Sequence, residues 1–485
     1  MALPPRPVVV VLGAGLSGLA AADALCSTPP QHRPHVILLD PSARAGGVVE
    51  TIRREGWLAE RSADNVLAAR PEALAVIERL GLSGELMAVR EGARRALVWR
   101  EGKTLPVPAG FRLLAPGTPA GIRETDILSA EGKARVLAER DVPLRAGDDD
   151  ESLESFAVRR LGREAFDRLV QPLVAGIWTA DPAKLSMAAA CPEFLSMERE
   201  HGSLSVGEET RLARMGESHR GEGARYGQFV TLASGMGRLA ERWQERLRTS
   251  GVEWRCGRAT AVSRDAAGRF RVEAVGAEGE PQAIAADGVV VALPAPIAAG
   301  VVAPLDAGVA GELAAIEYAG SVVVVLGWPR QAVAHPLDAA GLVVPRIEGR
   351  AALAISFSSS KFPGRAPEGQ VLLRVFLGGA LDPERTLLDD DRLVALATRE
   401  AADLLGARGV PSFVEIARWP GAMPQYHLGH GARLARIDRG VASFPGLALA
   451  GAAYGGVGIP QVIGSGTAAA ARILERIGTL GARPG

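Results

Sequence analysis

The sequence predicts an α/β protein built around a discontinuous, Rossmann-like domain. Two observations predict this fold. Apolar strand-like runs at 8–12 and 36–39 flank a glycine-rich turn and a helix-like segment at 16–25, the pattern of a βαβ unit. Further apolar strands that could extend the same sheet lie far along the chain, at 288–292 and 447–450. We therefore expect a mixed β-sheet domain and a helical domain to be inserted between parts of the Rossmann-like domain.

The intervening sequence supports two such insertions. Strand-like segments at 96–99 and 105–107 are followed by a largely helical region at 120–220, and a second β-rich stretch covers 322–377. After the strand at 447–450, a glycine-rich turn leads into a helix at 460–477. A chain of 485 residues exceeds one ordinary core and suits two or three domains.

Composition restricts the function classes. Hydrophobic residues make up 47% of the chain and charged residues 23%, as in soluble globular proteins. The 55 basic residues equal the 55 acidic ones, so no global field would attract nucleic acid. Cys26, Cys191 and Cys256 are too widely spaced for a disulfide framework or a zinc knuckle, which favours a reducing, cytoplasmic location. We expect no transmembrane helix, and peripheral attachment to the inner face of the cell membrane stays open.

The turn after the first strand predicts a dinucleotide site. In Gly13-Ala14-Gly15-Leu-Ser17-Gly18, the glycines permit a tight turn, backbone approach to a pyrophosphate and close helix–strand packing. The pyrophosphate would lie at the helix N-terminus. Asp40 ends the second strand, 22 residues after Gly18, where a carboxylate accepts hydrogen bonds from the adenosine ribose.

Two further glycine-rich segments favour FAD over NAD. The turn Arg44-Ala-Gly46-Gly47 resembles the continuation of the FAD site in flavoproteins. At the other end of the chain, Gly451 begins a second such turn, and the backbone N–H groups at its end could face a flavin ring. The residues that we expect there are Val457, Gly458 and Ile459. No cysteine lies in this turn, so we expect noncovalent FAD.

No side-chain catalytic centre is apparent. The sequence contains no nucleophile elbow and no paired catalytic cysteine and histidine. His427 and His430 lie three apart, but they have no third ligand nearby, so we expect no metal site. A cofactor would therefore carry the chemistry.

Several longer motifs carry a resemblance to one family. They are Gly176-Ile-Trp178-Thr-Ala-Asp181-Pro, Met197-Glu-Arg-Glu200-His201, Phe362-Pro363-Gly-Arg365, Phe376-Leu-Gly378-Gly379 and Trp419-Pro-Gly-Ala-Met-Pro424. With the two glycine-rich ends, they make the chain resemble, over essentially its whole length, the oxygen-dependent, FAD-containing protoporphyrinogen oxidases of the amine-oxidase-like flavoproteins.

The resemblance implies the reaction. Six hydrogens would leave protoporphyrinogen IX in three two-electron steps of heme biosynthesis, with hydride passing to flavin N5 and O2 returning as peroxide. Coproporphyrinogen III oxidation to coproporphyrin III is one alternative. Its substrate has four carboxylates, and Arg90, Arg94 and Lys361 are candidates for the additional cations. An amine or polyene oxidase of the same superfamily is another alternative. A nucleotide-fold binding protein that has lost its flavin is a third. The resemblance also suggests a membrane-facing helical domain, a homodimer and hand-off of product to the next heme-pathway enzyme.

It further implies a division of the chain into segments. The FAD-binding domain would comprise 1–85, 223–304 and 416–485. The substrate domain would comprise 86–118 and 305–415, and the helical domain 119–222.

It also implies site residues. The macrocycle would contact Gly176, Val343, Ser356 and Phe376, and Arg95 would bind a substrate carboxylate because a guanidinium pairs with a carboxylate bidentately. Further FAD contacts would come from Ser62, Ala63, Asp64, Ala259 and Trp419.

Some positions depart from the family pattern. Ser62-Ala63 replaces the usual Gly-Pro, Gln461-Val462 replaces Asp-Cys, and Trp178 replaces a smaller aromatic residue. Ser356 stands where relatives often have an apolar residue. These departures leave the pocket shape and the flavin tuning open.

Overall fold

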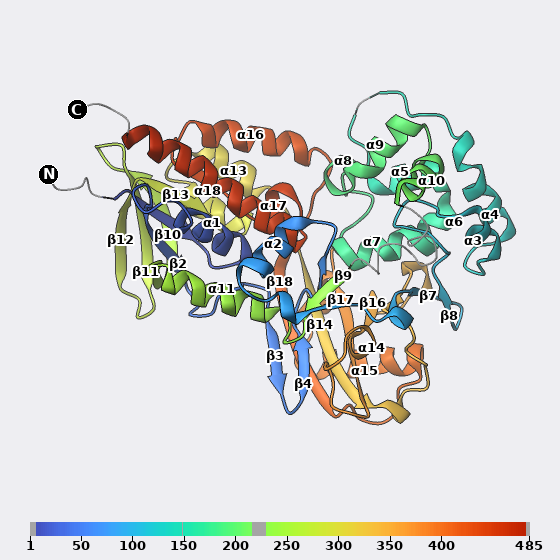
Figure 1. Cartoon of the computed structure of the whole chain (residues 1–485). Helices are drawn as coiled ribbons and strands as arrows, with labels where there is room; N and C mark the ends of the chain where they lie inside the picture. The colour runs from blue at the N-terminus through green and yellow to red at the C-terminus, as the bar shows by residue number, and fades with distance from the viewer. Residues whose placement is uncertain (1–5, 148, 216–228, 482–485) are drawn as a thin grey trace.

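The computed structural model describes residues 6–147, 149–215 and 229–481. Figure 1 shows a β-sheet layered between helices on one side of the molecule, a helical region on the other, and a second sheet below them. The predicted α/β class is confirmed.

The first sheet collects strands from widely separated parts of the chain. Its order is β12-β11-β10-β2-β1-β13-β19. Parallel pairing joins β10, β2, β1, β13 and β19, and β11 and β12 extend the sheet antiparallel. The strands are β1 (Val8–Leu12), β2 (His35–Asp40), β10 (Glu253–Arg264), β11 (Phe270–Gly276), β12 (Pro281–Ala286), β13 (Gly288–Val291) and β19 (Leu447–Leu449).

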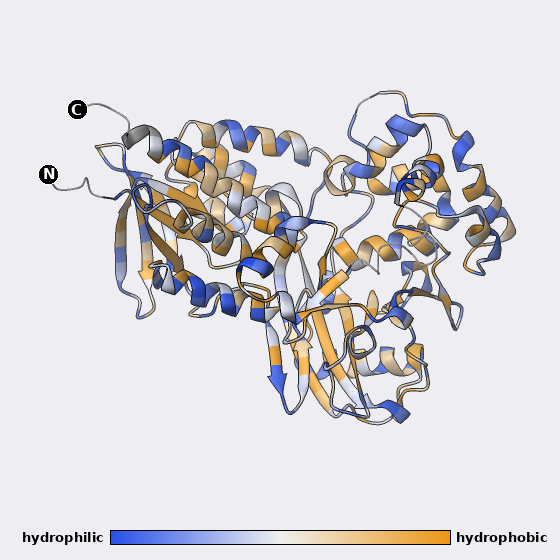
Figure 2. Ribbon diagram, viewed as in Figure 1, coloured by the Kyte–Doolittle hydropathy of each residue, from blue (hydrophilic) through white to orange (hydrophobic). Residues whose placement is uncertain are grey.

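Helices cover both faces of this sheet, which explains why its central strands are continuously apolar. Val9 and Val11 pack on one side with helices α1 (Leu16–Cys26), α2 (Pro71–Arg79), α11 (Gly237–Thr249) and α18 (Ile459–Gly481). Val10 and Leu12 face the other side, with α12 (Ala295–Val302), α13 (Ala307–Ala314) and α16 (His430–Ala442). Figure 2 shows hydrophobic strands between helices with hydrophilic outer faces. Both faces are thus withdrawn from water.

The second sheet is mixed, with the order β18-β14-β17-β16-β15-β7-β8. Helix α15 (Asp390–Leu405) packs on one face. The strands are β7 (Ala96–Arg100), β8 (Lys103–Pro106), β14 (Tyr318–Pro329), β15 (Gly341–Val343), β16 (Ala354–Phe357), β17 (Gln370–Gly378) and β18 (Phe413–Pro424). The predicted boundary at 415/416 falls inside β18, which pairs with β14 on both sides of that point. The other domain boundaries stay predictions.

Small elements join these layers. The hairpin β3 (Thr51–Arg54) and β4 (Trp57–Glu60) and the three-stranded sheet of β5 (Val66–Leu67), β9 (Phe229–Leu232) and β6 (Leu86–Ala88) are separate from the two large sheets. Short helices α14 (Ser358–Lys361) and α17 (Ala452–Gly455) lie at the ends of β16 and β19.

The expected helical region is confirmed within the described residues. It comprises α3 (Pro119–Glu124), α4 (Ala130–Leu137), α5 (Leu153–Leu161), α6 (Arg163–Ala165), α7 (Gln171–Trp178), α8 (Met187–Ala190), α9 (Pro192–His201) and α10 (Leu204–Met215). A fully buried ion pair, Arg160 with Glu139, ties several of these helices together, because Glu139 also accepts from Ser203 Oγ at 2.6 Å and from the Leu204 N–H at 2.9 Å. Among the described helices, none is long and apolar enough to cross a membrane. That this region faces a membrane stays a prediction.

Candidate active site

The first glycine-rich turn is shaped by close backbone contacts. Gly13 has φ +100°, and a Cβ there would lie 2.6 Å from Ala292 O. A Cβ at Gly18 would collide with the Gly13 carbonyl oxygen. Gly15 differs: it precedes α1, no side chain caps this helix end, and a Cβ at Gly15 would meet no atom within 4 Å. Open space therefore lies before a helix N-terminus, as a diphosphate requires.

Asp40 and the Gly46-Gly47 turn close around this site. The Asp40 carboxylate accepts from the Ala14 N–H at 2.7 Å and from the Ser42 N–H at 2.7 Å. Gly46 N–H donates to Ala14 O at 2.8 Å. Arg44 donates to the carbonyls of Val49 (3.0 Å) and Gly47 (2.6 Å), so in this structure its side chain shapes the turn itself.

The C-terminal turn lies against the first one. A Cβ at Gly451 (φ +138°) would be 3.9 Å from Ser17 Oγ, and the Gly451 N–H donates to Ser465 Oγ at 3.0 Å. Tyr426 holds the turn from the other side: its hydroxyl accepts from the Gly456 N–H at 2.9 Å and donates to Ala452 O. Val457 and Gly458 then lead into α18, which begins at Ile459. Residues from both ends of the chain thus form one site.

The turn also depends on a buried histidine. His430 is 3% exposed, its Nε2 lies 3.0 Å from Ala453 O, and its ring stacks on Tyr426. Burial lowers the pKa of His430 to about 4. No cluster of three metal-ligating side chains was found in the described part of the chain.

The remaining predicted cofactor residues are divided between two places. Ser62 Oγ donates to Val48 O at 2.6 Å, and Trp419 Nε1 donates to Arg61 O at 2.7 Å, which joins β18 to the segment 61–64. Ala63 and Asp64 belong to the same segment. Ala259 lies on β10, where the pairing with β11 becomes irregular.

Four of the five predicted substrate residues line one cavity of about 270 Å³, together with Asp64. Val343, Ser356 and Phe376 lie on one face of the second sheet: Ala354 pairs with both Val343 and Phe376, and Ser356 pairs with Arg374. Cross-strand partners and alternate residues share a face, so the sheet forms one wall. Gly176 lines the cavity from α7, and a Cβ there would meet no atom within 4 Å.

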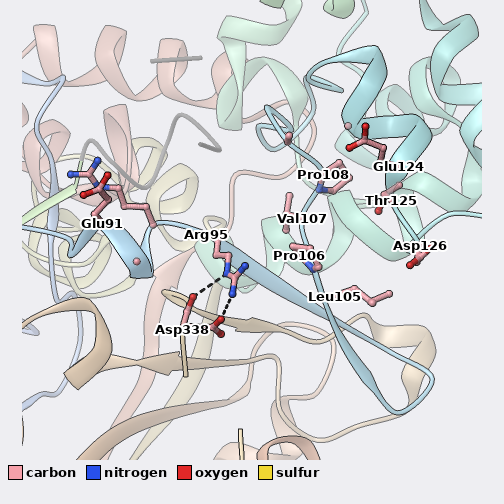
Figure 3. Close-up of a pocket in the computed structure, with 14 residues that line it drawn as sticks. Glu91, Arg95, Leu105, Pro106, Val107, Pro108, Glu124, Thr125, Asp126 and Asp338 are labelled. Carbon is pink, nitrogen blue, oxygen red and sulfur yellow. Dashed lines mark hydrogen bonds and ion pairs between the residues drawn. The ribbon is translucent and has the colours of Figure 1, made fainter. Parts of the chain in front are cut away.

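Arg95 is not brought to this cavity. It directly precedes β7, whose first residue, Ala96, lines the cavity, and successive side chains point to opposite faces. The Arg95 side chain, 52% exposed, lies at a larger cavity of about 770 Å³ and pairs with Asp338, as Figure 3 shows. Its Nε also donates to Asp338 O at 3.0 Å. Substrate binding by Arg95 stays a prediction from the resemblance alone.

Two cations lie in the cavity wall. Of the three cations expected around a substrate with four carboxylates, Lys361 lines this cavity but Arg90 and Arg94 do not, whereas Arg374 was not predicted. Lys361 and Arg374 are buried, and both pair with Asp64, Arg374 through Nη1 at 3.1 Å. Burial acts to raise the pKa of Asp64, but the two cations outweigh it and hold the pKa at about 2. A signal for Arg374 was available: it lies two residues before Phe376 in a strand, hence on the same face. Lys361 directly precedes the Phe362-Pro363 motif.

Comparison with known proteins shows the family to which the chain belongs. A family profile described as flavin containing amine oxidoreductase matches residues 16–474. The chain is 31% identical over 466 residues to a coproporphyrinogen III oxidase of Bacillus subtilis, covering 95% of this chain and 96% of that protein. It is 27% identical to a chloroplastic protoporphyrinogen oxidase of Nicotiana tabacum, covering 94% and 83%.

A solved structure agrees over the whole fold. The crystal structure of a protein from Exiguobacterium sp. 255-15, provisionally named a protoporphyrinogen oxidase, matches with a TM-score of 0.84 at 28% identity, covering 97% of this chain and 99% of that one. The resemblance to porphyrinogen oxidases is thereby confirmed. The chain is a flavin-dependent oxidoreductase and belongs to the family of flavin-containing amine oxidoreductases.

Proposed function

We propose that this protein is a porphyrinogen oxidase that uses noncovalently bound FAD and passes the electrons to O2. One observation carries the proposal. The cavity lined by Gly176, Val343 and Phe376 also includes Asp64, which belongs to the predicted flavin-contacting segment. A porphyrinogen could therefore lie between α7 and the second sheet while one of its methylene bridges approaches the flavin.

The residues present fit FAD. The helix end at Gly15 is open, and Asp40 lies beside it for the ribose. The N-terminus of α18 would stabilise negative charge on a reduced flavin ring. Cys26 lies inside α1 and Cys191 at the end of α8. Cys256 pairs with Asp40 across the first sheet. No cysteine belongs to the C-terminal turn itself, which supports noncovalent binding.

The lining of the cavity indicates what the protein and the cofactor would each contribute to the reaction. Bound FAD would supply the hydride acceptor. The protein would hold a bridge carbon near it, and the apolar side chains of Val343 and Phe376 would exclude water from one side of the macrocycle. We assign no side chain as an acid or a base.

Of the two porphyrinogens, we favour coproporphyrinogen III. Two relatives above 30% identity carry that name, the second from Propionibacterium freudenreichii at 32% identity over 493 residues. The buried cations Lys361 and Arg374 are also compatible with a substrate that has four carboxylates. Protoporphyrinogen IX is the second candidate, supported by the plant relatives at 27–28% identity.

The test is anaerobic mixing of each porphyrinogen with at least three equivalents of the purified yellow protein, because each flavin accepts only two of the six electrons. Bleaching of the flavin together with growth of porphyrin fluorescence is expected for coproporphyrinogen III, and more slowly for protoporphyrinogen IX. Faster bleaching by protoporphyrinogen IX than by coproporphyrinogen III would make protoporphyrinogen IX the favoured substrate. Bleaching by neither porphyrinogen would favour an amine or polyene oxidase, and protein purified without flavin would favour a binding protein.

A further inference from the structure

Arg374 and Ser356 form a polar pair within the cavity wall. They are register partners on the antiparallel strands β17 and β16, so their Cβ atoms are neighbours on one face of the sheet. Both residues line the cavity, next to the register pair of Phe376 and Ala354 on the same face. The guanidinium is packed against the Phe376 ring, with Cζ 5.1 Å from the ring centroid.

Each member of this pair has a buried donor without a partner among the described residues. Arg374 is 2% exposed; its Nη1 contacts Asp64 and its Nη2 donates to Ser62 O, but Nε has no acceptor among the described residues. Ser356 Oγ is likewise buried and unpaired. Buried donors are rarely left unsatisfied in folded proteins. Two of them on one wall of a cavity indicate an acceptor that arrives with the ligand.

The surrounding charged residues indicate the sign of the charge that the ligand carries. Arg374 belongs to a buried cluster of three cations and two carboxylates, which leaves an excess of one positive charge when all are ionised. The members are Glu60, Asp64, Lys361, Arg365 and Arg374. An uncompensated buried charge is costly, so an anion is the ligand that the cluster favours.

We propose that Arg374 and Ser356 bind one carboxylate of the substrate, one oxygen accepting from Arg374 Nε and the other from Ser356 Oγ. Asp64 and Ser62 then have a positioning role, because they hold the two terminal nitrogens of the guanidinium. Arg374 and Ser356 would thus fix which side of the macrocycle enters first. This inference rests on the proposed function, since it requires a porphyrin-type substrate.

The test measures binding rather than turnover. Coproporphyrin III and its tetramethyl ester are titrated against the holoenzyme, and the change in porphyrin fluorescence gives a Kd for each. We expect Ser356→Ala to weaken the free acid about tenfold, the loss of one hydrogen bond to a charged group, and to leave the ester nearly unchanged. Arg374→Lys keeps the charge but loses the Nε donor and should weaken the acid further, by about 100-fold.

Ser358→Ala is the matched control. Ser358 Oγ is also buried and unpaired in the described structure, but Ser358 is not among the residues lining the cavity, so both Kd values should stay at the wild-type level. Equal weakening of acid and ester by Ser356→Ala would overturn the proposal, and so would unchanged binding of the acid. If the wild type binds neither porphyrin and no porphyrinogen bleaches its flavin, it is the proposed function that fails. Bleaching with unaltered acid binding in both variants refutes the carboxylate pair alone.

Discussion

Two alanine substitutions in the same turn should separate the role of glycine in folding from its role in cofactor binding. At Gly18, a Cβ would collide with the Gly13 carbonyl oxygen where α1 packs against β1. At Gly15, a Cβ would meet nothing within 4 Å, and the backbone there (φ −67°, ψ 173°) suits any residue. The same added methyl group is therefore obstructed by protein at one position and points into the expected diphosphate space at the other.

The magnitudes differ accordingly. Gly18→Ala should lower the free energy of unfolding by about 1–3 kcal/mol or more, the usual cost of overpacking, because the obstructing atom is backbone. For Gly15→Ala, the gain of about 0.4–1 kcal/mol from a less flexible unfolded chain offsets the poorer N-cap, so we expect a change within about 0.5 kcal/mol. Loss of one N–H contact to a phosphate should nevertheless weaken flavin binding by at least about 1.5 kcal/mol, roughly tenfold.

The assay combines denaturant unfolding of the flavin-free protein with flavin retention on dialysis of the holoenzyme. We expect Gly15→Ala to unfold like the wild type but lose flavin, and Gly18→Ala to unfold at lower denaturant concentration. Wild-type flavin retention in Gly15→Ala would refute the placement of the diphosphate at this helix end.

Three further predictions concern stability and reactivity. Arg160→Met should lower the free energy of unfolding by about 3–5 kcal/mol, because Glu139 stays buried without its cation. Arg163→Met, which removes an exposed pair, should lower it by only about 0–1 kcal/mol. Equal losses for the two variants in denaturant melts would contradict the role of the buried pair. Burial holds His430 neutral and lowers its pKa to about 4, below the ordinary value of 6.5. As the pH falls, the unfolded chain therefore binds a proton at this histidine before the folded protein does. The free energy of unfolding should decrease by up to about 3 kcal/mol between about pH 6.5 and about pH 4. His430→Gln should flatten this part of the stability–pH curve, and an unchanged slope would show that His430 does not cause it. Cys256 is exposed, whereas Cys26 and Cys191 are buried, and burial raises the pKa of Cys26 to about 11. A thiol reagent should therefore modify one cysteine in the native protein and three after unfolding. Fast modification of Cys26 in the native protein would contradict its burial.

The parts of the fold that were predicted from sequence are those with strong local patterns. The βαβ unit at the N-terminus and α18 at the C-terminus were found because apolar runs and glycine turns mark their ends. Strands β10 and β18 were missed because much of each strand is only partly buried, so neither reads as an apolar run. Neither burial pattern alternates strictly, so neither segment carries a clear period-2 signal.

Site residues could be predicted where the backbone conformation requires a particular residue type. They were harder to predict where the direction of a side chain decides whether it reaches the cavity. Gly13, Gly15 and Gly18 follow from the turn itself. Arg95 was placed by resemblance, but the alternation of β7 directs Ala96 into the cavity and leaves Arg95 beside Asp338. The spacing of Arg374 to Phe376 places both on one face of a strand, but only the pairing of β16 with β17 puts Arg374 beside Ser356.

The most direct test of porphyrinogen oxidation by flavin and O2 is the stoichiometry of the complete reaction. Coproporphyrinogen III is mixed with the holoenzyme in air, and porphyrin, O2 consumed and peroxide formed are measured together. Removal of six hydrogens in three two-electron steps predicts three O2 consumed and three peroxides formed for each coproporphyrin III, with no porphyrin formed beyond the uncatalysed rate by flavin-free protein. Porphyrin formation that proceeds equally without the flavin, or without peroxide, would contradict the account.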